Sequence, residues 1–268
     1  MSHRRNAGFT ILELALTLAI LGMLAGAVLV PFVAQLRQRN ISDTEKLLED
    51  VKEALLGYAM ATGRVPCPAT ATSNGLESFA TGGGSMVNGN CAAAGATAHV
   101  GFLPAVTLGI SSVDKEGFAV DAWGTTQNRI RYAVANVNIN GLANTSTFTR
   151  TGGMKAATAS GMATNTSLLY VCASGDGGAN MTAATNCGTA IRLADNAPVV
   201  IWSVGPNAAT GGTGADEAQN PNPSGGSADR IFVSRTTNQT AGNEFDDLVT
   251  WLSVGNLVSR MVMGGQLP

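Results

Sequence analysis

The sequence predicts an α+β protein in which a long N-terminal helix packs on an antiparallel β-sheet with disulfide-tied loops. Three observations support this fold class. The chain starts with a long apolar segment that continues into an amphipathic one, both with helical character. Several later segments are rich in β-branched and aromatic residues, as strands are. Four cysteines lie in or beside polar stretches that are rich in glycine.

The first apolar segment runs from Phe9 to Phe32, and its only strongly polar side chain is Glu13. As a helix, about 24 residues would extend roughly 36 Å, which is enough to cross a bilayer. We therefore expect a transmembrane helix over residues 9–33. An ionised carboxylate within a membrane costs about 2.5–3.5 kcal/mol on insertion scales, so Glu13 either reaches the headgroups or has a cationic partner.

The residues before this segment are polar and basic, and they end in small residues up to Gly8. A secretory signal peptide has its small-residue cleavage site after the apolar stretch, whereas here the small residues precede it. Cleavage after Gly8 would leave the apolar helix intact and would create an ammonium group on Phe9, about one helical turn from Glu13. Such a cation, on the same chain or on a neighbouring one, would offset the cost of burying the carboxylate.

The stretch Gly8-Phe-Thr-Ile-Leu-Glu13-Leu, with basic residues upstream, resembles the class III signal of the type IV pilin and type II secretion pseudopilin superfamily. The resemblance implies that a prepilin peptidase cuts between Gly8 and Phe9 and N-methylates Phe9. It also implies that Glu13 sets the register in a helical filament by pairing with the amino terminus of a neighbouring subunit. Residues 1–8 would then be a leader peptide, and residues 64–268 a pilin-like globular domain.

Residues 34–63 are expected to continue the helix in amphipathic form. Apolar residues recur there at helical spacing, namely Leu48, Val51, Leu55, Tyr58 and Ala59. This spacing produces one face that is suited to cover a sheet. The stretch Ser42-Asp-Thr-Glu45 fits a capping box, which starts a new helix or stabilises a continuous one. Gly63, Pro66 and Pro68 are expected to end the helix.

Strands are predicted in the rest of the chain at residues 129–135, 167–173, 198–204, 231–235 and 247–253, with a short helix at 257–263. Residues 129–135 alternate in polarity, which predicts a half-buried strand with Arg129 and Arg131 on its polar face. Trp123, in the turn before this strand, is expected in the core. The stretches 69–98 and 205–226 are rich in small polar residues and glycine, so they are interpreted as loops.

The four cysteines are Cys67, Cys91, Cys172 and Cys187. An even number in a membrane-anchored domain predicts two disulfides in an oxidising compartment. Of the three pairings, we favour Cys67–Cys91 and Cys172–Cys187, because each closes a polar, glycine-rich loop. Closing loops of this size stabilises by about 3 kcal/mol each in the chain-entropy model. A zinc site is disfavoured, because no two cysteines are spaced C-x-x-C and His99 is the only histidine outside the leader.

The composition argues against nucleic-acid binding and against catalysis. Loss of Arg4 and Arg5 with the leader would change the formal charge from −2 to −4, so nothing favours binding to nucleic acid. His99 is a single histidine, and no G-x-S-x-G motif is present. Asp246 and Asp247 are adjacent and would point to different faces of a helix or strand, so they are interpreted as a solvated edge. We therefore predict that the protein is not an enzyme.

We expect no cofactor, with calcium as the alternative. Major pseudopilins, which carry a similar signal, bind calcium through an acidic loop, and Asp176, Asp216 and Glu217 are predicted loop acids of this chain. The ligand pattern of that loop is absent from the sequence, however. Calcium therefore stays the weaker expectation.

The sequence thus predicts a structural subunit of a type IV pilus or a type II secretion pseudopilus. Its size and its polar insertions favour a minor subunit. The expected partners are a prepilin peptidase, other subunits of a helical filament, and the bacterial inner membrane, with the globular domain in the periplasm. This orientation rests on the resemblance and on the cysteines, because Arg4 and Arg5 before the span balance Arg37 and Arg39 after it. The alternative is a membrane-anchored adhesin or ligand-binding module that does not polymerise.

Overall fold

The computed structural model describes residues 10–92, 98–139, 141–142, 145–175, 186–209, 214–220, 230–240 and 242–268. Side chains are described in these ranges except at residues 25 and 27–31. The chain divides into two compact units, Met1–Ser42 and Asp43–Pro268. The second unit contains two β-sheets and two disulfides, so the predicted α+β class is confirmed. The boundaries proposed at residues 8, 33 and 63 remain predictions.

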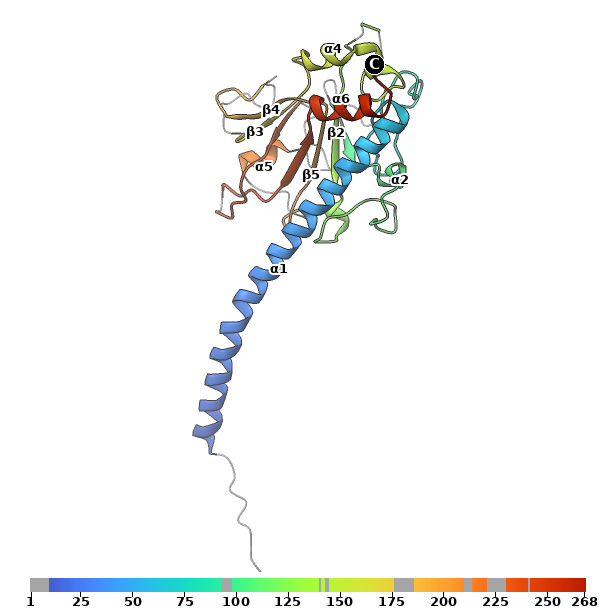
Figure 1. The fold of residues 1–268 in the computed structure, drawn as a ribbon. Helices are drawn as coiled ribbons and strands as arrows, with labels where there is room; N and C mark the ends of the chain where they lie inside the picture. Colours follow the sequence, from blue (N-terminus) through green and yellow to red (C-terminus); the bar gives the residue numbers. More distant parts are fainter. Residues whose placement is uncertain are drawn as a thin grey trace, which may run out of the picture. The chain divides into compact units, whose positions relative to one another are not determined.

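Helix α1 is continuous from Ile11 to Thr62 (Figure 1). The predicted capping box at residues 42–45 lies inside this helix and does not start a new one. The helix ends where Gly63 adopts a φ of 73° and donates its N–H to the carbonyl oxygen of Ala59 at 2.9 Å. A left-handed glycine of this kind often ends a helix, because it lacks a Cβ that would clash.

The part of α1 in the second unit buries one face. Leu48, Val51, Leu55 and Ala59 are each no more than 3% exposed. Their spacing of three or four residues places them on one side of the helix. They belong to the same hydrophobic core as the buried residues of the four-stranded sheet described next.

The larger sheet has four antiparallel strands in the order β1-β2-β5-β7. The strands are β1 (Ala98–Phe102), β2 (Arg131–Ala135), β5 (Val199–Ser203) and β7 (Leu248–Leu252). The register places Val134 of β2 opposite His99 of β1 on one side and Val199 of β5 on the other. The two central strands, β2 and β5, are buried along their whole length, which explains why they are rich in valine, isoleucine and aromatic residues.

A smaller sheet has the strand order β4-β3-β6. Its strands are β3 (Leu169–Cys172), β4 (Arg192–Ala197) and β6 (Ile231–Val233). β3 is antiparallel to β4 but parallel to β6, so this sheet departs from the purely antiparallel arrangement that was predicted. The two sheets are joined where β4 passes through Pro198 into β5, and the ring centroids of Trp202 and Phe232 pack 5.1 Å apart between them.

Short helices connect the strands. They are α2 (Ala105–Leu108), the 3₁₀ helix η1 (Thr126–Asn128), α3 (Gly153–Ala157), α4 (Ala159–Ala163) and α5 (Ala215–Gln219). The longer helix α6 (Val254–Met263) begins at Ser253, whose Oγ accepts the N–H of Asn256 at 3.2 Å. Arg260 of α6 pairs with Glu53 of α1 at 3.0 Å, so the two helices lie side by side (Figure 1).

The five predicted strands and the C-terminal helix are all present, with shifted ends. Strands β1 and β4 were not predicted. β1 begins at the last residue of the predicted loop 69–98, and its sequence Ala-His-Val-Gly-Phe contains a glycine, which weakens the pattern of a strand. β4 has the sequence Arg-Leu-Ala-Asp-Asn-Ala, which has low β-propensity, and it becomes a strand because it pairs with β3.

Strand β2 corrects two predictions about its surroundings. Arg131 is 2% exposed rather than on a solvated face, because its guanidinium lies 4.2 Å from the ring centroid of Phe102 in the neighbouring strand. Burial, with a smaller effect of Arg129, lowers the pKa of Arg131 to about 9. Trp123 is only partly buried at its turn and does not belong to the core.

We predict that Leu55→Ala lowers the free energy of unfolding by about 2–5 kcal/mol, because it removes buried methyl groups and leaves a cavity under α1. The matched control is Asp50→Ala on the exposed face of the same helix, which should change stability by no more than about 0.5 kcal/mol. Urea unfolding of the full chain in detergent micelles, followed by tryptophan fluorescence, measures both. Equal effects of the two variants would contradict the packing of α1.

Candidate functional site

The N-terminal segment carries the residues that the sequence assigns to processing and assembly. Gly8 and Phe9 lie outside the described residues. Glu13 lies in the first turn of α1, and its backbone N–H donates to Oγ1 of Thr10 at 3.2 Å, so Thr10 caps the helix. The Glu13 side chain is exposed, and within the described part of the chain no salt bridge involves it.

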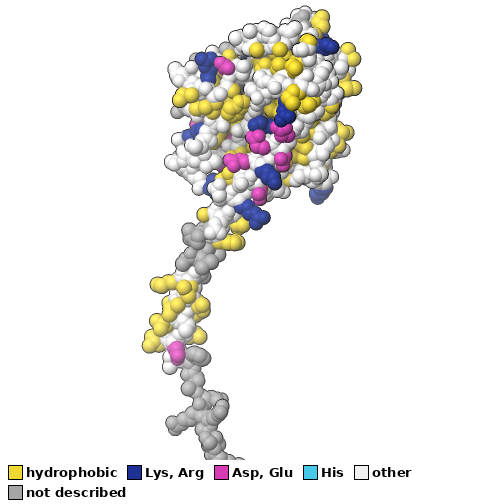
Figure 2. All heavy atoms as spheres, in the orientation of Figure 1, with side chains coloured by type: hydrophobic (Ala, Val, Ile, Leu, Met, Phe, Trp, Pro, Cys, Tyr) yellow, Lys and Arg dark blue, Asp and Glu magenta, His cyan; other side chains and the backbone are white. Residues whose placement is uncertain are grey.

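Large apolar side chains cover residues 11–24 of α1 (Figure 2). Their exposed fractions in the isolated chain range from 51% to 89% for Ile11, Leu12, Leu14, Leu16, Leu18, Ile20, Leu21, Met23 and Leu24. A helix that is apolar on every side is normally buried by other helices or by lipid. This segment therefore has the surface of a helix that contacts other molecules.

The predicted membrane span at residues 9–33 is not confirmed. Where side chains are described, the chain contains no helix whose length and apolar character suffice to cross a membrane. Phe9 and the side chains at residues 25 and 27–31 fall within the predicted span but outside that description.

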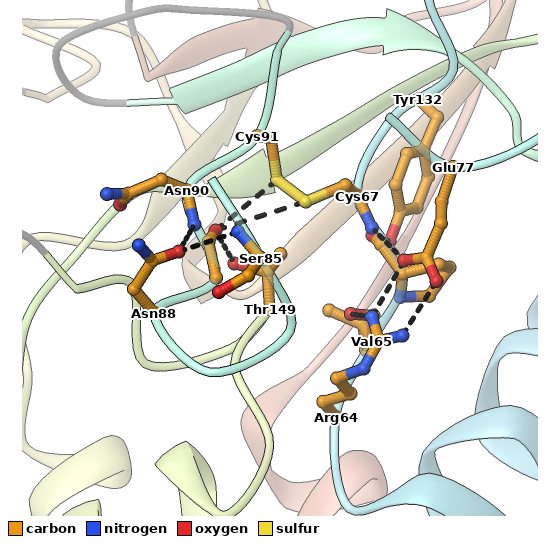
Figure 3. Close-up of a disulfide and its surroundings, with 12 residues drawn as sticks. Arg64, Val65, Cys67, Glu77, Ser85, Asn88, Asn90, Cys91, Tyr132 and Thr149 are labelled. Carbon is orange, nitrogen blue, oxygen red and sulfur yellow. Dashed lines mark hydrogen bonds and ion pairs between the residues drawn. A yellow bond between two sulfur atoms is a disulfide. The ribbon is translucent and has the colours of Figure 1, made fainter. Parts of the chain in front are cut away.

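The four cysteines form the two favoured pairs, Cys67–Cys91 and Cys172–Cys187. The first disulfide is buried and closes a loop of the stretch 69–98 (Figure 3). The carbonyl oxygen of Gly89, inside this loop, accepts a hydrogen bond from the hydroxyl of Thr149, which attaches the loop to a distant part of the chain. The structure thus excludes a zinc site at these cysteines, because none of them is a free thiol.

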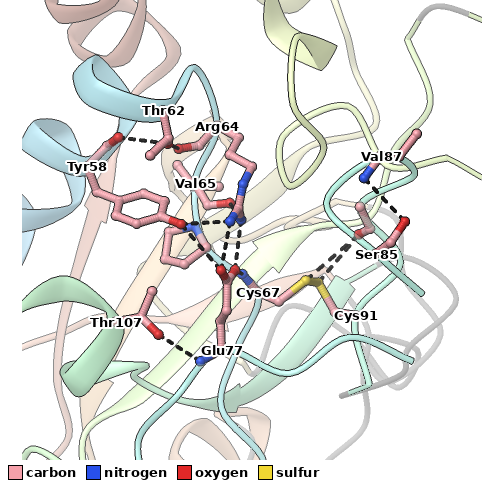
Figure 4. Close-up of polar contacts among 12 residues, drawn as sticks. Tyr58, Thr62, Arg64, Val65, Cys67, Glu77, Ser85, Val87, Cys91 and Thr107 are labelled. Atoms are coloured by element: carbon pink, nitrogen blue, oxygen red, sulfur yellow. Dashed lines mark hydrogen bonds and ion pairs between the residues drawn. A yellow bond between two sulfur atoms is a disulfide. The ribbon is translucent and has the colours of Figure 1, made fainter. Parts of the chain in front are cut away.

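A buried ion pair attaches the same loop to the end of α1. Arg64 is 2% exposed, and its two terminal nitrogens each lie 2.7 Å from a carboxylate oxygen of Glu77. Tyr58 of α1 accepts a further bond from Arg64 at 2.7 Å, and the N–H of Cys67 donates to Glu77 at 3.2 Å (Figure 4). Burial alone would lower the pKa of Arg64, but the hydrogen bonds and charge of Glu77 outweigh it and raise this pKa.

A second group of acids gathers where α5 meets the start of β7. Oxygen atoms of Glu217, Asp246 and Asp247 all lie within 4.8 Å of one another. Glu217 is 5% exposed and Asp247 is 4% exposed. The interpretation of this acidic pair as a solvated edge was therefore wrong for Asp247, whereas Asp246 is partly buried. Sequence reasoning missed this group because α5 and β7 are separated in the chain. The available signal was the position of two adjacent acids directly before an apolar strand, where one of the two side chains is expected to be buried.

The environment of Asp247 is unusual for a carboxylate. Burial raises its pKa well above the ordinary value, and the charges of Glu217 and Asp246 raise it further, while a hydrogen bond from Asn220 and the charge of Arg131 oppose this. Asp247 also lines a surface groove between α1 and β7, together with Glu45, Leu48, Glu49, Ser234, Arg235, Leu248, Val249 and Thr250. Acidic side chains gather on this face of the molecule (Figure 2).

The predicted loop acids have different positions from those expected. Asp216 lies in α5, where it pairs with Arg235 at 2.7 Å and accepts a bond from Ser174 at 3.0 Å. Glu217 also lies in α5 and not in a loop. Asp176 lies outside the described residues. His99, which a catalytic site would need, is 4% exposed within β1.

Comparison with known proteins matches the N-terminal segment to a family model. Residues 3–29 match the model of the prokaryotic N-terminal methylation motif. This motif is the signature of the prepilin-type signals of type IV pilins and pseudopilins. No curated protein and no solved structure matches the chain.

The chain therefore carries a prepilin-type signal at its N-terminal segment. The motif indicates a structural subunit rather than an enzyme. The motif covers the N-terminal segment alone, so it gives no information about the globular domain.

We predict that Glu77→Gln lowers the free energy of unfolding by about 3–5 kcal/mol, because it leaves the Arg64 charge buried without its partner. The double variant Arg64→Met, Glu77→Leu should cost less than the single one, because it removes both charges and keeps apolar volume at the site. Denaturant unfolding compares the two. A double variant that is less stable than Glu77→Gln would contradict this account of the ion pair.

Proposed function

We propose that this protein is a structural subunit that assembles through its N-terminal helix into a type IV pilus or a type II secretion pseudopilus. A prepilin peptidase would cut between Gly8 and Phe9 and methylate the new amino group of Phe9. The observation that carries the proposal is the methylation motif at residues 3–29, whose later part lies in α1 and carries exposed apolar side chains.

The chemistry of the first turn supports assembly. Glu13 is the only charged residue between Phe9 and Phe32, and its carboxylate is costly to bury without a cation. Cleavage creates an ammonium group on Phe9, and in a bundle of helices one subunit's ammonium would pair with the next subunit's Glu13. This pair would fix the axial register, because any other register leaves a buried charge without a partner.

The exposed apolar side chains of α1 provide the affinity for such a bundle. Helices with small residues pack closely, and Gly22 and Gly26 both have open space where a Cβ would lie. Before assembly, the same surface would hold the subunit in the inner membrane, with the globular domain in the periplasm. The two disulfides fit an oxidising compartment of this kind.

We predict that the protein purified from its native membrane begins at Phe9 and carries one added methyl group. Cleavage after Gly8 removes the eight-residue leader, and methylation follows on the new amino terminus. Intact-mass measurement and sequencing of the N-terminal peptide by mass spectrometry test both modifications. A chain that still begins at Met1 or Ser2, in cells that contain the peptidase, would contradict processing and would favour an ordinary membrane anchor.

We predict that Glu13→Ala is still cleaved but is lost from filaments, because the unpaired ammonium of Phe9 no longer has its partner. Thr17→Ala, one turn further along the helix, is the matched control and should assemble normally. Immunoblots of sheared or cross-linked filaments measure incorporation, and mass spectrometry measures cleavage. Normal incorporation of Glu13→Ala would contradict the role of Glu13 in setting the register. Absence of the wild-type protein from filaments would argue for the second class of protein, a membrane-anchored adhesin or binding module that does not polymerise.

A further inference from the structure

Three carboxylates from two separate segments meet inside the globular domain. Glu217 comes from α5, whereas Asp246 and Asp247 directly precede β7. One oxygen of each lies within 4.8 Å of the other two. Like charges repel at this distance, so the cluster needs an explanation in the chemistry around it.

One oxygen of the cluster is buried without a hydrogen-bond donor. Glu217 is 5% exposed, and its Oε1 accepts a bond from Nδ2 of Asn207. Its Oε2 is fully buried and has no hydrogen-bond partner in the described part of the chain. Leaving a buried carboxylate oxygen unsatisfied costs more than leaving a neutral group unsatisfied, which points to a positively charged ligand at this position.

The neighbouring arginine does not satisfy Glu217. Arg235 is engaged with Asp216, the adjacent residue of α5, at 2.7 Å. Within the described residues, no ion pair involves Glu217 itself. The protein therefore places the guanidinium of Arg235 beside Asp216, and the carboxylate of Glu217 lies near two other carboxylates.

Two neighbouring residues, Asn220 and Gly205, fix the positions of Asp247 and Asp246. Asn220 is 3% exposed, and its side-chain amide bonds both the N–H and the carbonyl oxygen of Val233, at 2.8 and 2.9 Å. The same amide donates to Asp247 at 2.7 Å. On the other side, a Cβ at Gly205 would lie 2.6 Å from Oδ1 of Asp246 and 2.5 Å from its carbonyl oxygen, so only glycine permits this close approach. Gly205 has a φ of 65°, which also favours glycine.

From this geometry we infer that Glu217, Asp246 and Asp247 bind a calcium ion that ties α5 to the start of β7. Carboxylate oxygens are ligands for hard cations such as Ca²⁺ and Mg²⁺. Calcium binds oxygen at about 2.3–2.6 Å in flexible geometry, so one ion can contact oxygens up to about 5.2 Å apart, and the three oxygens lie within this limit. Magnesium requires about 2.0–2.1 Å and near-ideal octahedral geometry, so it places a stricter requirement on the positions of the same oxygens. The inference does not depend on filament assembly.

The test uses the full chain in detergent micelles, stripped of metal with EGTA. Titration calorimetry with CaCl₂ should show binding, and the melting temperature should rise by about 5–10 °C at a hundredfold excess over Kd. MgCl₂ should give a smaller shift. Glu217→Gln and Asp246→Asn should lose most of the calcium shift. Asp195→Asn, which changes an exposed acid of β4, is the matched control and should keep the shift.

Two outcomes separate a calcium site from a purely structural cluster. In EGTA, Glu217→Gln should melt at or above the wild-type temperature, because it removes a repulsion, whereas in calcium it should melt below the wild type. Absence of binding heat and of a melting shift in the wild type would overturn the inference, even if the variants fail to fold. An equal shift with magnesium would overturn the assignment of calcium.

Discussion

Burial of one face of α1 against the four-stranded sheet is the contact on which the rest of the globular domain depends. Leu48, Val51 and Leu55 fill the core from one side, and the central strands β2 and β5 fill it from the other. The helix is also the link between the two units of the chain. Because one continuous helix supplies both the exposed apolar segment and part of the domain core, the domain holds the C-terminal end of that helix in place.

The domain contains few charged residues, and several of them are inside it. Arg64 and Glu77 form a buried pair beside the Cys67–Cys91 disulfide, so a long polar loop is fixed to the end of α1 at two points. Asn220 fixes β6 in a similar way, since its side-chain amide bonds the backbone of Val233 as a neighbouring strand would. Loops rich in glycine and small polar residues thus acquire order from a small number of buried side chains.

The same electrostatic constraint recurs at the two sites with proposed functions. Glu13 lies in an apolar helix, and Glu217 lies with Asp246 and Asp247 in the domain interior. In the proposed filament at Glu13, and in the buried cluster at Glu217, a carboxylate in a low-dielectric environment requires a cation. At Glu13 the proposed cation is the amino terminus of a neighbouring subunit, created by cleavage. At the cluster it is a metal ion, which would stabilise the domain independently of assembly.

The sequence by itself determined the features that depend on local pattern, namely the helical spacing of α1, the apolar runs that form β5 and β7, and the signal around Gly8 and Glu13. These features could be predicted because periodicity and short motifs involve residues that are neighbours in the chain. The favoured cysteine pairs were also correct, because each closes a nearby loop. Only the tertiary structure decided the pairing that makes β4 a strand, the burial of Arg131 under Phe102, and the meeting of Glu217 with Asp247. These features arise from contacts between segments far apart in the chain, and the burial of a polar group is a property of its three-dimensional surroundings rather than of its neighbours in sequence.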